Sequence, residues 1–588
     1  MGVPTNGAKS RILIPEKVSP DGLALLKDSF EVDEKKGLSP DELKSIIGDY
    51  EALIVRSETK VTAELLDAAK KLKVVARAGV GVDNVDVQKA TSLGIIVVNS
   101  PSGNINAAAE HTIALMMAVA RNIGDGCSSI KAGKWERSRL VGVEAKGKTL
   151  AIVGLGKVGL TVARIANGLS MRLIGYDPYA NPNLAAAASV TLKPSLADLL
   201  KEADFLTLHT PLIASTKGMI GKAELATMKP TARILNVARG GMIDEDALVE
   251  ALDAGTIAGA GIDVFTSEPP QPDSSASRLI AHPKCVATPH LGASTKEAQE
   301  NVSIDVCEQV VSILSGELPR SAVNAPIILP EEFRTLQPFV TLVEKMGSLY
   351  TQHYSSRVNA THFRTTFDIT YEGALANCNT TKPLFAALVK GLLTPITSSD
   401  GLNINIVNAE QLAKERGILV NEQRSRENVE DKAYSSFITL RARASRSTSQ
   451  ARPGVSRSNS EAAARSLKPQ ETEEDQIIQG FVSGNKPFIS RLDRFKGEFV
   501  PRGTLLICRN FDSCGKIGYV GNQLGKAGVN IKFMNVAPLH DDVEEGQNGD
   551  VEGSEALMIL GVDKPVEEDV VKGLIGPEGV LEASVVTL

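Results

Sequence analysis

The first half of the chain alternates short apolar runs with longer stretches in which apolar residues recur at helical spacing. Between residues 11 and 100 this alternation predicts strands joined by crossover helices, at 39–50 and 62–72. Such a rhythm is typical of a parallel sheet in an α/β domain. The four predicted strands span residues 11–15, 52–57, 73–79 and 95–100.

A second α/β unit follows a long apolar helix predicted at 106–121. A further helix is predicted at 297–314, and residues 319–332 suit a linker because of their prolines. Six strand-like runs give this unit the same rhythm as the first, at residues 149–156, 172–177, 205–210, 232–238, 259–264 and 284–290.

The pattern weakens beyond residue 330. We expect a mixed region there, with a strand within 360–373 and a helix at 382–393. Residues 441–475 are rich in arginine and serine and lack aromatic residues, so they cannot bury enough apolar surface to offset chain entropy, and disorder is predicted. Residues 503–588 have the strand and helix order of a ferredoxin-like domain, with an acidic loop at 541–555.

Composition and charge exclude several classes of protein. At 588 residues the chain is too long for one hydrophobic core, so three or four domains are expected. A net charge of -6 gives no broad positive field for nucleic acid or an anionic membrane, and the longest apolar run, 113–120, is too short to span a bilayer. The six cysteines form no CxxC pair, so we expect a reduced, cytoplasmic protein without a bound metal.

The turn that follows the apolar residues 149–153 carries the pattern GxGxxG, formed by Gly154, Gly156 and Gly159. A helix comes next, and a second strand ends at Asp177, 18 residues after Gly159, close to the spacing of about 20 residues that is typical of the motif. The glycines allow a tight turn and close approach of a pyrophosphate, whose charge the helix N-terminus favours. Asp177 would bind ribose hydroxyls and repel a 2′-phosphate, which predicts NAD rather than NADP. The same unit would also suit a non-enzymatic regulator.

Three polar residues stand at strand ends of the second unit. Arg239 follows the strand at 232–238, His290 ends the strand at 284–290, and Glu268 lies between them in DVFTSEPP. Loops at the carboxyl ends of parallel strands line one crevice, where ligands bind. Hydride transfer to or from a 2-hydroxy acid requires a cation, a proton carrier and a group that orients the carrier. From the residues alone, a surface charge or a structural hydrogen bond remains an alternative for each.

Several segments together resemble the D-isomer-specific 2-hydroxyacid dehydrogenases. The similarity covers about residues 11–326 and rests on RAGVGVDNVD, KWER, GKTLAIVGLGKVG, LHTPL, LNVARGGMIDEDAL, AGIDVFTSEPP and TPHLGASTKEA. The later regions resemble the intervening and ACT domains of the family's long form. The resemblance implies an α/β fold with a doubly wound Rossmann NAD-binding domain at 103–293 and a split flavodoxin-like substrate domain at 10–102 and 294–326. It also implies an α+β intervening domain at 327–500 and a ferredoxin-like ACT domain at 503–588.

Carried over position by position, the resemblance implies a role for each strand-end residue. Arg239 would bind substrate and polarise its C2 carbonyl, His290 would act as general acid and base, and Glu268 would orient His290. The substrate phosphate would be bound by arginines, for which solvated surface charges are the alternative, namely Arg56, Arg77 and Arg137. Besides the three glycines and Asp177, cofactor contacts are implied at Val80, Lys157, Val158, Thr210, Val237, Ala238, Arg239, Asp263, His290, Leu291, Gly292 and Ala293.

The implied activity is NAD-dependent oxidation of a phosphorylated 2-hydroxy acid, 3-phosphoglycerate, at the start of L-serine biosynthesis. A glyoxylate or hydroxypyruvate reductase of the same family, or a non-enzymatic NAD-sensing interaction protein, remains an alternative. The family also implies a homodimer or homotetramer. His111, inside the long helix, is expected to be a packing or capping residue, and neither it nor His209 is expected to carry the proton.

The ACT resemblance implies an L-serine effector site between paired sheets, at Asn510, Asp512 and Asn530. Cys514 stands where a proline is usual, and the acidic loop is longer than in relatives, so a domain that only holds the oligomer together is the alternative. The arginine- and serine-rich tract is expected to be a passive spacer, with phosphorylation as the alternative.

Overall fold

The structure is a computed structural model that describes residues 9–355, 364–397, 403–425, 436–443, 476–538 and 555–588. Internal contacts divide the chain into two compact units. Unit 1 holds residues 1–62, 74–85 and 98–321, and unit 2 holds residues 63–73, 86–97 and 322–588. Among the described residues, no helix combines the length and the apolar character needed to cross a membrane.

The first sheet has five strands in the order β2-β1-β3-β4-β5, with parallel pairing from β2 through β4. This is the strand order of flavodoxin-like sheets, as predicted. The prediction missed β2, because this edge strand has the polar sequence EVDE and no buried residue. The strands are β1 (Arg11–Ile14), β2 (Glu31–Glu34), β3 (Ala52–Val55), β4 (Val74–Arg77) and β5 (Ile96–Asn99). The helices between them are α1 (Pro20–Lys27), α2 (Pro40–Ile46), η1 (Ile47–Asp49), α3 (Ala63–Ala68) and α4 (Val87–Ser92).

The second sheet has seven parallel strands in the order β12-β11-β10-β9-β6-β7-β8. Six were predicted; the seventh, β8, is a three-residue edge strand with two exposed residues, too short to form an apolar run. The strand order is doubly wound and reverses between β6 and β9, where ligands of such sheets bind. The strands are β6 (Thr149–Val153), β7 (Arg172–Tyr176), β8 (Val190–Leu192), β9 (Phe205–Leu208), β10 (Arg233–Asn236), β11 (Gly259–Ile262) and β12 (Cys285–Ala287).

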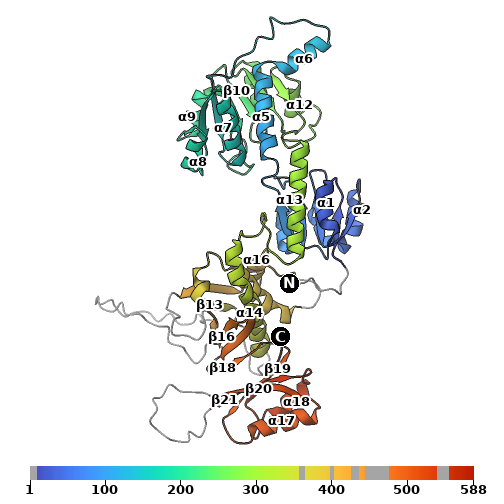
Figure 1. The fold of residues 1–588 in the computed structure, drawn as a ribbon, viewed down its shortest axis with the longest axis vertical. Helices are drawn as coiled ribbons and strands as arrows, with labels where there is room; N and C mark the ends of the chain where they lie inside the picture. Colours follow the sequence, from blue (N-terminus) through green and yellow to red (C-terminus); the bar gives the residue numbers. More distant parts are fainter. Residues whose placement is uncertain (1–8, 356–363, 398–402, 426–435, 444–475, 539–554) are drawn as a thin grey trace, which may run out of the picture. The chain divides into compact units, whose positions relative to one another are not determined.

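Helices cover both faces of this sheet, and Figure 1 shows α5 and α7 side by side against it. The long helix predicted at 106–121 is α5, one residue earlier than expected. The helices are α5 (Ile105–Ala120), α6 (Ile123–Lys131), α7 (Lys157–Gly168), α8 (Pro182–Ala187), α9 (Leu196–Glu202), α10 (Lys222–Thr227), α11 (Glu245–Asp253) and α12 (Ser275–Ala281).

The chain returns to the first sheet through α13 (Lys296–Leu314), which packs against α1 and β4. A Cβ added at Gly22 of α1 would lie 3.1 Å from Sγ of Cys307. Val306, Cys307 and Val310 of α13 are fully buried. Segments on both sides of the second sheet in the sequence thus share one layer, which a split substrate domain requires.

The third sheet, in unit 2, has six strands in the order β14-β13-β15-β16-β17-β18. Its main covering helix, α14, was not predicted and begins inside the expected linker at 319–332. The strands are β13 (Thr366–Glu372), β14 (Leu419–Ser425), β15 (Phe437–Arg443), β16 (Gln476–Ser483), β17 (Lys486–Leu492) and β18 (Phe495–Phe499). The helices are α14 (Pro330–Ser355), η2 (Gly373–Asn377), α15 (Lys382–Leu393), η3 (Thr394–Ile396) and α16 (Ala409–Glu415).

The predicted disorder of residues 441–475 is wrong for its first three residues. Residues 441–443 end β15 and pair with β13, where Arg443 also forms an ion pair with the buried Asp368. The hydrogen bonds to β13 and the ion pair with Asp368 stabilise these residues as a strand, although their local composition favours disorder. Residues 444–475 lie outside the described residues.

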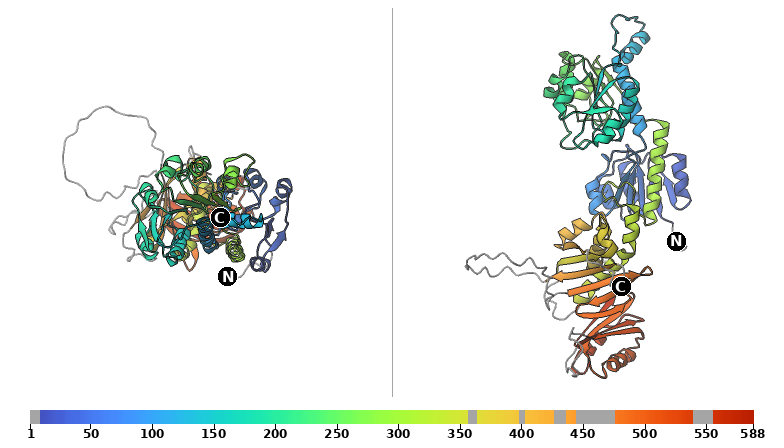
Figure 2. Two further views of the ribbon diagram at one scale, coloured as in Figure 1. Left: turned by 90° about the horizontal axis from the view of Figure 1, so that it is seen from above. Right: turned by 60° about the vertical axis from the view of Figure 1, so that its left-hand side comes forward.

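The fourth sheet has the antiparallel order β20-β21-β19-β22, as in ferredoxin-like domains. Figure 2 shows its two helices, in red, on one face of the sheet. On the other face, Leu505, Ile507 and Val586 share a core with Leu342 and Met346 of α14. The elements are β19 (Thr504–Phe511), α17 (Lys516–Lys526), β20 (Ile531–Pro538), β21 (Glu555–Val562), α18 (Glu568–Leu574) and β22 (Glu582–Thr587). The acidic loop expected at 541–555 ends one residue earlier, because Glu555 starts β21; residues 541–554 lie outside the described residues.

Within unit 2, the turn between α4 and β5 is bound by a cluster of asparagines that precedes α16. The carbonyl of Gly94 accepts hydrogen bonds from Nδ2 of Asn405 at 2.6 Å and of Asn403 at 3.2 Å. The buried Asn408 holds both in place: its Oδ1 accepts from the Asn405 N–H, and its Nδ2 donates to the Asn403 carbonyl. Gly94 has φ +69, and a Cβ there would lie 2.3 Å from the Asn403 carbonyl oxygen.

Replacing Gly94 with alanine is expected to lower the free energy of unfolding more than the same change at Gly37. Both glycines have positive φ, +69 and +74, so both variants carry the same backbone strain. Only Gly94 has a neighbour within 4 Å of the added methyl group. The additional clash costs about 1–3 kcal/mol, measurable by denaturant unfolding of the two variants. Equal losses would show that the asparagine cluster moves aside freely.

Candidate active site

The glycine turn joins β6 to α7 and has the geometry that a dinucleotide site needs. Gly154 has φ +91, and a Cβ there would lie 2.5 Å from the carbonyl oxygen of His209. A Cβ on Gly159 would lie 2.1 Å from the Gly154 carbonyl oxygen, so helix and strand approach too closely for any side chain. Around Gly156, by contrast, an added Cβ meets nothing within 4 Å. The backbone at Gly156 is therefore accessible to a pyrophosphate at the N-terminus of α7.

Asp177 follows β7 and binds back to the glycine turn. Its Oδ2 accepts a hydrogen bond from the Leu155 N–H at 2.9 Å, and its Oδ1 accepts from the Tyr179 N–H at 2.8 Å. The carboxylate thus lies beside the turn, where a ribose would follow the pyrophosphate. Lys157, the first residue of α7, donates from Nζ to Oγ of Ser102 at 2.7 Å.

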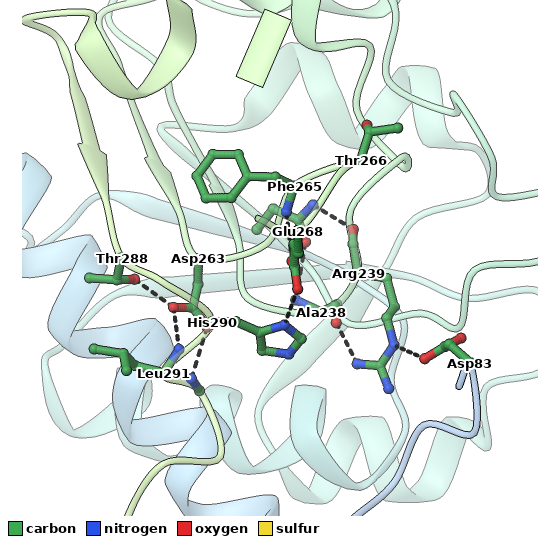
Figure 3. Close-up of polar contacts among 12 residues, drawn as sticks. Asp83, Ala238, Arg239, Asp263, Phe265, Thr266, Glu268, Thr288, His290 and Leu291 are labelled. Carbon is green, nitrogen blue, oxygen red and sulfur yellow. Dashed lines mark hydrogen bonds and ion pairs between the residues drawn. The ribbon is translucent and has the colours of Figure 1, made fainter. Parts of the chain in front are cut away.

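The turn after β10 presents Arg239 to the same side of the sheet. Asn236, a buried residue that the sequence analysis did not single out, shapes this turn: its Nδ2 donates to the Arg239 carbonyl at 2.8 Å, and its Oδ1 accepts from the Ala238 N–H at 3.1 Å. Nη1 of Arg239 donates to the Ala238 carbonyl at 2.7 Å. Its Nε lies 3.3 Å from Oδ2 of Asp83 (Figure 3). These contacts hold the guanidinium over the loop after β4.

His290 and Glu268 form a hydrogen-bonded pair (Figure 3). Nδ1 of His290 lies 2.6 Å from Oε2 of Glu268, whose Oε1 accepts from the Phe265 N–H at 2.9 Å. Partial burial alone would raise the pKa of Glu268, but the hydrogen bonds from His290 and Phe265 lower it below the ordinary value. A glutamate that stays ionised can fix the tautomer of the imidazole, with the proton on Nδ1. Among the described residues, Nε2 of His290 has no hydrogen-bond partner, which leaves it for a reacting hydroxyl.

Asp263, fully buried after β11, holds the turn that carries His290. Its Oδ1 accepts from the Leu291 N–H at 2.7 Å and its Oδ2 from the Gly292 N–H at 2.8 Å. Burial by itself would raise the pKa of Asp263, but hydrogen bonds from His111, Thr288 and these amides lower it. Nε2 of His111 lies 3.2 Å from Oδ1 of Asp263. His111 is therefore part of the site's framework, and its only signal in the sequence is a histidine inside an apolar helix.

The other predicted cofactor contacts lie around the same strand ends. Thr210 follows β9 and donates from Oγ1 to Sδ of Met242 at 3.1 Å, and Val237 is buried after β10. Val80 is 37% exposed in the loop after β4, and Val158 lies in the first turn of α7. The neighbouring His209 is partly exposed, but the loss of water around its ring lowers its pKa to about 4 and keeps the ring neutral.

Of the arginines predicted for the substrate phosphate, two gather with Arg239. Burial lowers the pKa of Arg77, and the positive charges of Arg239 and Arg56 lower it further, so the three cations lie within electrostatic reach of one another. Nε of Arg77 is buried and has no hydrogen-bond partner among the described residues. Asp83 and Glu16 act on Arg77 in the opposite sense, so three arginines face two carboxylates and the net positive charge that is left suits a phosphate anion. Arg137 is exposed after α6, and none of the hydrogen bonds or ion pairs described for the chain joins it to this cluster.

The predicted effector residues do not meet within one chain. Asn510 is paired with Ala556 at one end of β21, and Ile531, next to Asn530, is paired with Val562 at the other end. At roughly 3.4 Å per residue these positions are about 20 Å apart. Asp512 is exposed just beyond β19. Asn510 is buried and, within the described part of the chain, its Oδ1 has no partner.

Comparison with known proteins gives the family. Residues 113–292 match the model of the D-isomer specific 2-hydroxyacid dehydrogenase NAD binding domain, and residues 335–461 match that of the D-3-phosphoglycerate dehydrogenase intervening domain. The chain is 42% identical over 581 residues to D-3-phosphoglycerate dehydrogenase 2, chloroplastic, of Arabidopsis thaliana. This match covers 98% of the present chain and 86% of the Arabidopsis protein. The proteins named D-3-phosphoglycerate dehydrogenase of Archaeoglobus fulgidus and Bacillus subtilis are 37% and 36% identical, over 98% of this chain and 100% and 99% of theirs.

The similarity covers nearly the whole chain and includes the strands that carry the glycine turn and the His290–Glu268 pair. The predicted fold class and the NAD cofactor are confirmed by the matching NAD-binding domain. The chain is an NAD-dependent D-2-hydroxyacid dehydrogenase and belongs to the D-3-phosphoglycerate dehydrogenase family.

Proposed function

We propose that the protein oxidises 3-phosphoglycerate to 3-phosphohydroxypyruvate with NAD, the first step of the phosphorylated route to L-serine. The contact of 2.6 Å between His290 and Glu268, at the strand ends that also carry Arg239, is the observation that carries the proposal. A protein that only senses NAD has no need of an oriented proton carrier. The relatives in three organisms bear the name of this enzyme.

The side chains divide the reaction among them. NAD, when bound on the turn of Gly154, Gly156 and Gly159, supplies the hydride acceptor. Arg239 binds the substrate carboxylate and the C2 oxygen through its two-pronged guanidinium. His290 takes the hydroxyl proton at Nε2 while Glu268 keeps the ring oriented through Nδ1 and stabilises the imidazolium that forms. The phosphate is expected near Arg56 and Arg77, whose positive charges would attract it.

The test is NADH formation from a panel of 2-hydroxy acids that includes 3-phosphoglycerate, glycerate and lactate. We expect a clear preference for the phosphorylated acid, because an unmatched cation cluster penalises a substrate without the phosphate. Preference for glycerate, whose oxidation at C2 is the reverse of hydroxypyruvate reduction, would assign a different activity within the family. No turnover with any acid would favour the NAD-sensing alternative.

We also propose that the chain forms a homodimer or homotetramer, within which Asn510 and Asp512 of one copy meet Asn530 of another to bind L-serine. The opposite positions of these residues along β21 support a site made by two copies rather than one. Millimolar L-serine added to the same assay is expected to slow turnover. An unchanged rate would leave the four-stranded sheet with a purely structural role.

Exposed apolar residues on and after α6 support association through this segment: Ile123 is 56% exposed, Ile130 52%, Trp135 82% and Val141 79%. Trp135 is the only tryptophan of the chain, so its fluorescence reports this surface alone. Association is expected to bury Trp135 and shift its emission to shorter wavelength as concentration rises. Light scattering should show the change of mass over the same range, and a constant emission maximum across that change would place the interface elsewhere.

The proposal keeps the four-domain division and a cytoplasmic location. All six cysteines are free, and burial raises the pKa of the Cys285, Cys307 and Cys508 thiols to about 12, which makes them unreactive. Cell fractionation tests the location, and recovery in a plastid, the compartment named for the Arabidopsis relatives, would overturn it.

A further inference from the structure

A buried carboxylate outside the predicted site binds the loop that carries Glu268. Glu245 is the first residue of α11 and is 8% exposed. It does not cap the helix, because Asp244 does so by accepting the Ala247 N–H. Instead, Oε1 of Glu245 accepts from the N–H of Thr266 at 2.7 Å and from its Oγ1 at 2.8 Å, while Oε2 accepts from Oγ of Ser275 at 2.9 Å. A buried carboxylate is stable only with such a set of donors.

Thr266 stands one residue from Phe265 and two from Glu268, the two ends of the hydrogen bond that fixes the glutamate. The Phe265 N–H donates to Oε1 of Glu268 at 2.9 Å, and Oε2 of Glu268 binds His290. Figure 3 shows Phe265, Thr266 and Glu268 along one short loop above His290. A clamp on the backbone of Thr266 therefore acts on the orientation of the Glu268 carboxylate.

The other side of this loop packs against the turn that presents Arg239. A Cβ on Gly240 would lie 1.9 Å from the Phe265 carbonyl oxygen, so the two backbones are in direct contact. The loop is thus enclosed between the Gly240 turn on one side and Glu245 on the other. Any shift of the loop changes the separation between Arg239 and the His290–Glu268 pair.

We propose that Glu245 is a positioning residue: it sets the distance between the substrate-binding arginine and the proton carrier by clamping Thr266. It touches neither substrate nor cofactor, and the inference rests on the proposed function. Misplacement of reacting groups by about 1 Å costs roughly a hundredfold in rate, so the clamp is expected to act on kcat. Substrate affinity, which Arg239 and the phosphate-binding cluster determine, is expected to change little.

Two variants of Glu245 and one of its partner test the clamp. Glu245→Gln keeps an oxygen for Thr266 and lets Ser275 accept from the new amide, but it loses the charge that strengthens these bonds. Glu245→Ala removes all three acceptor contacts. Thr266→Val removes the hydroxyl donor from the other side at nearly constant volume. The matched control is Glu250→Gln on the same helix, where the side chain is 64% exposed and pairs with Lys222.

We expect kcat to fall about 100-fold in Glu245→Ala and about 10-fold in Glu245→Gln, with KM within threefold and NAD affinity unchanged. Adding Thr266→Val to Glu245→Ala should cause no further loss, because the partner is already gone. Glu250→Gln should match the unaltered protein. If Glu245→Ala does not fold, the Gln and Val variants carry the test.

Amide hydrogen exchange provides a readout that needs no substrate. The amides of residues 264–268 should exchange faster in the Glu245 and Thr266 variants and at the original rate in Glu250→Gln. Unchanged exchange would overturn the clamp, and faster exchange with unchanged kcat would overturn its positioning role. Absence of turnover by the unaltered protein, with the expected exchange pattern, would instead count against the proposed function.

Discussion

Replacing His290 with alanine is expected to lower kcat for oxidation of the 2-hydroxy acid by about 10²–10⁴-fold, the usual contribution of a general base. The ring is held by Glu268 through Nδ1, so its removal leaves no group placed to take the hydroxyl proton. NAD binding should persist, because the glycine turn and Asp177 are formed by β6, α7 and β7. Stopped-flow or steady-state turnover measures the loss, and isothermal titration with NAD measures the retained binding.

The matched control is His282→Ala. Nε2 of His282 lies 3.3 Å from Oδ1 of Asp253, so it too forms a histidine–carboxylate contact, but at the end of α12. His282 precedes β12 whereas His290 follows it, so loss of His282 should leave turnover within a factor of two or so. Turnover retained by His290→Ala would refute the assignment of the proton carrier. Loss of NAD binding in that variant would show that the turn had collapsed.

The pH dependence of kcat/KM is expected to show no titration of Glu268 in the neutral range. Its pKa in the folded protein is lowered, so its contribution to stability is fully present above the ordinary glutamate pKa and is lost as pH falls through the lowered value. The carboxylate is ionised throughout the neutral range. A fall of kcat/KM near neutral pH therefore reports a group other than Glu268.

Replacing Arg239 with glutamine is expected to lower kcat/KM by roughly 10²–10⁴-fold, since two charge-assisted hydrogen bonds are worth about 1.5–3 kcal/mol each. Part of the loss should appear in KM, because the carboxylate is bound in the ground state, and part in kcat, because the C2 oxygen gains charge during the reaction. Arg239→Lys keeps the charge without the planar fork and should recover only a part.

Arg320→Gln is the control for loss of one positive charge. Arg320 is 66% exposed and pairs with Glu308 on the surface, so its replacement should change kcat/KM little. Equal losses of kcat/KM in Arg239→Gln and Arg320→Gln would show that the net charge of the protein matters, and not the hydrogen bonds from the guanidinium of Arg239. If Arg239→Gln changed KM alone, Arg239 would bind the substrate carboxylate but would not stabilise the C2 oxygen during the reaction.

The sequence predicted most elements of unit 1 because their residues satisfy local rules. Alternating apolar runs marked β1, β3, β4 and β5, whereas β2 escaped because an edge strand needs no apolar run. The helix α14 escaped as well, since its start lies among prolines that favour a linker and Pro338 interrupts its interior. Its apolar face is buried only when it packs against the sheets that it covers, so the isolated segment does not indicate a helix.

Local sequence by itself determined the glycine turn, Asp177 and the choice of NAD, because the motif lies within one strand–helix–strand unit. Their positions at strand ends marked Arg239, Glu268 and His290 as candidates, and the resemblance supplied their roles. Only the tertiary structure decided that Glu245 binds Thr266, 21 residues away in the chain, and that His111 reaches Asp263, 152 residues away. Such contacts depend on how strands and helices pack around one core, and a side chain's own neighbours in the sequence carry no information about them. The same reason separates Asn510 from Asn530: strand register, which forms only in the folded sheet, places them at opposite ends of β21.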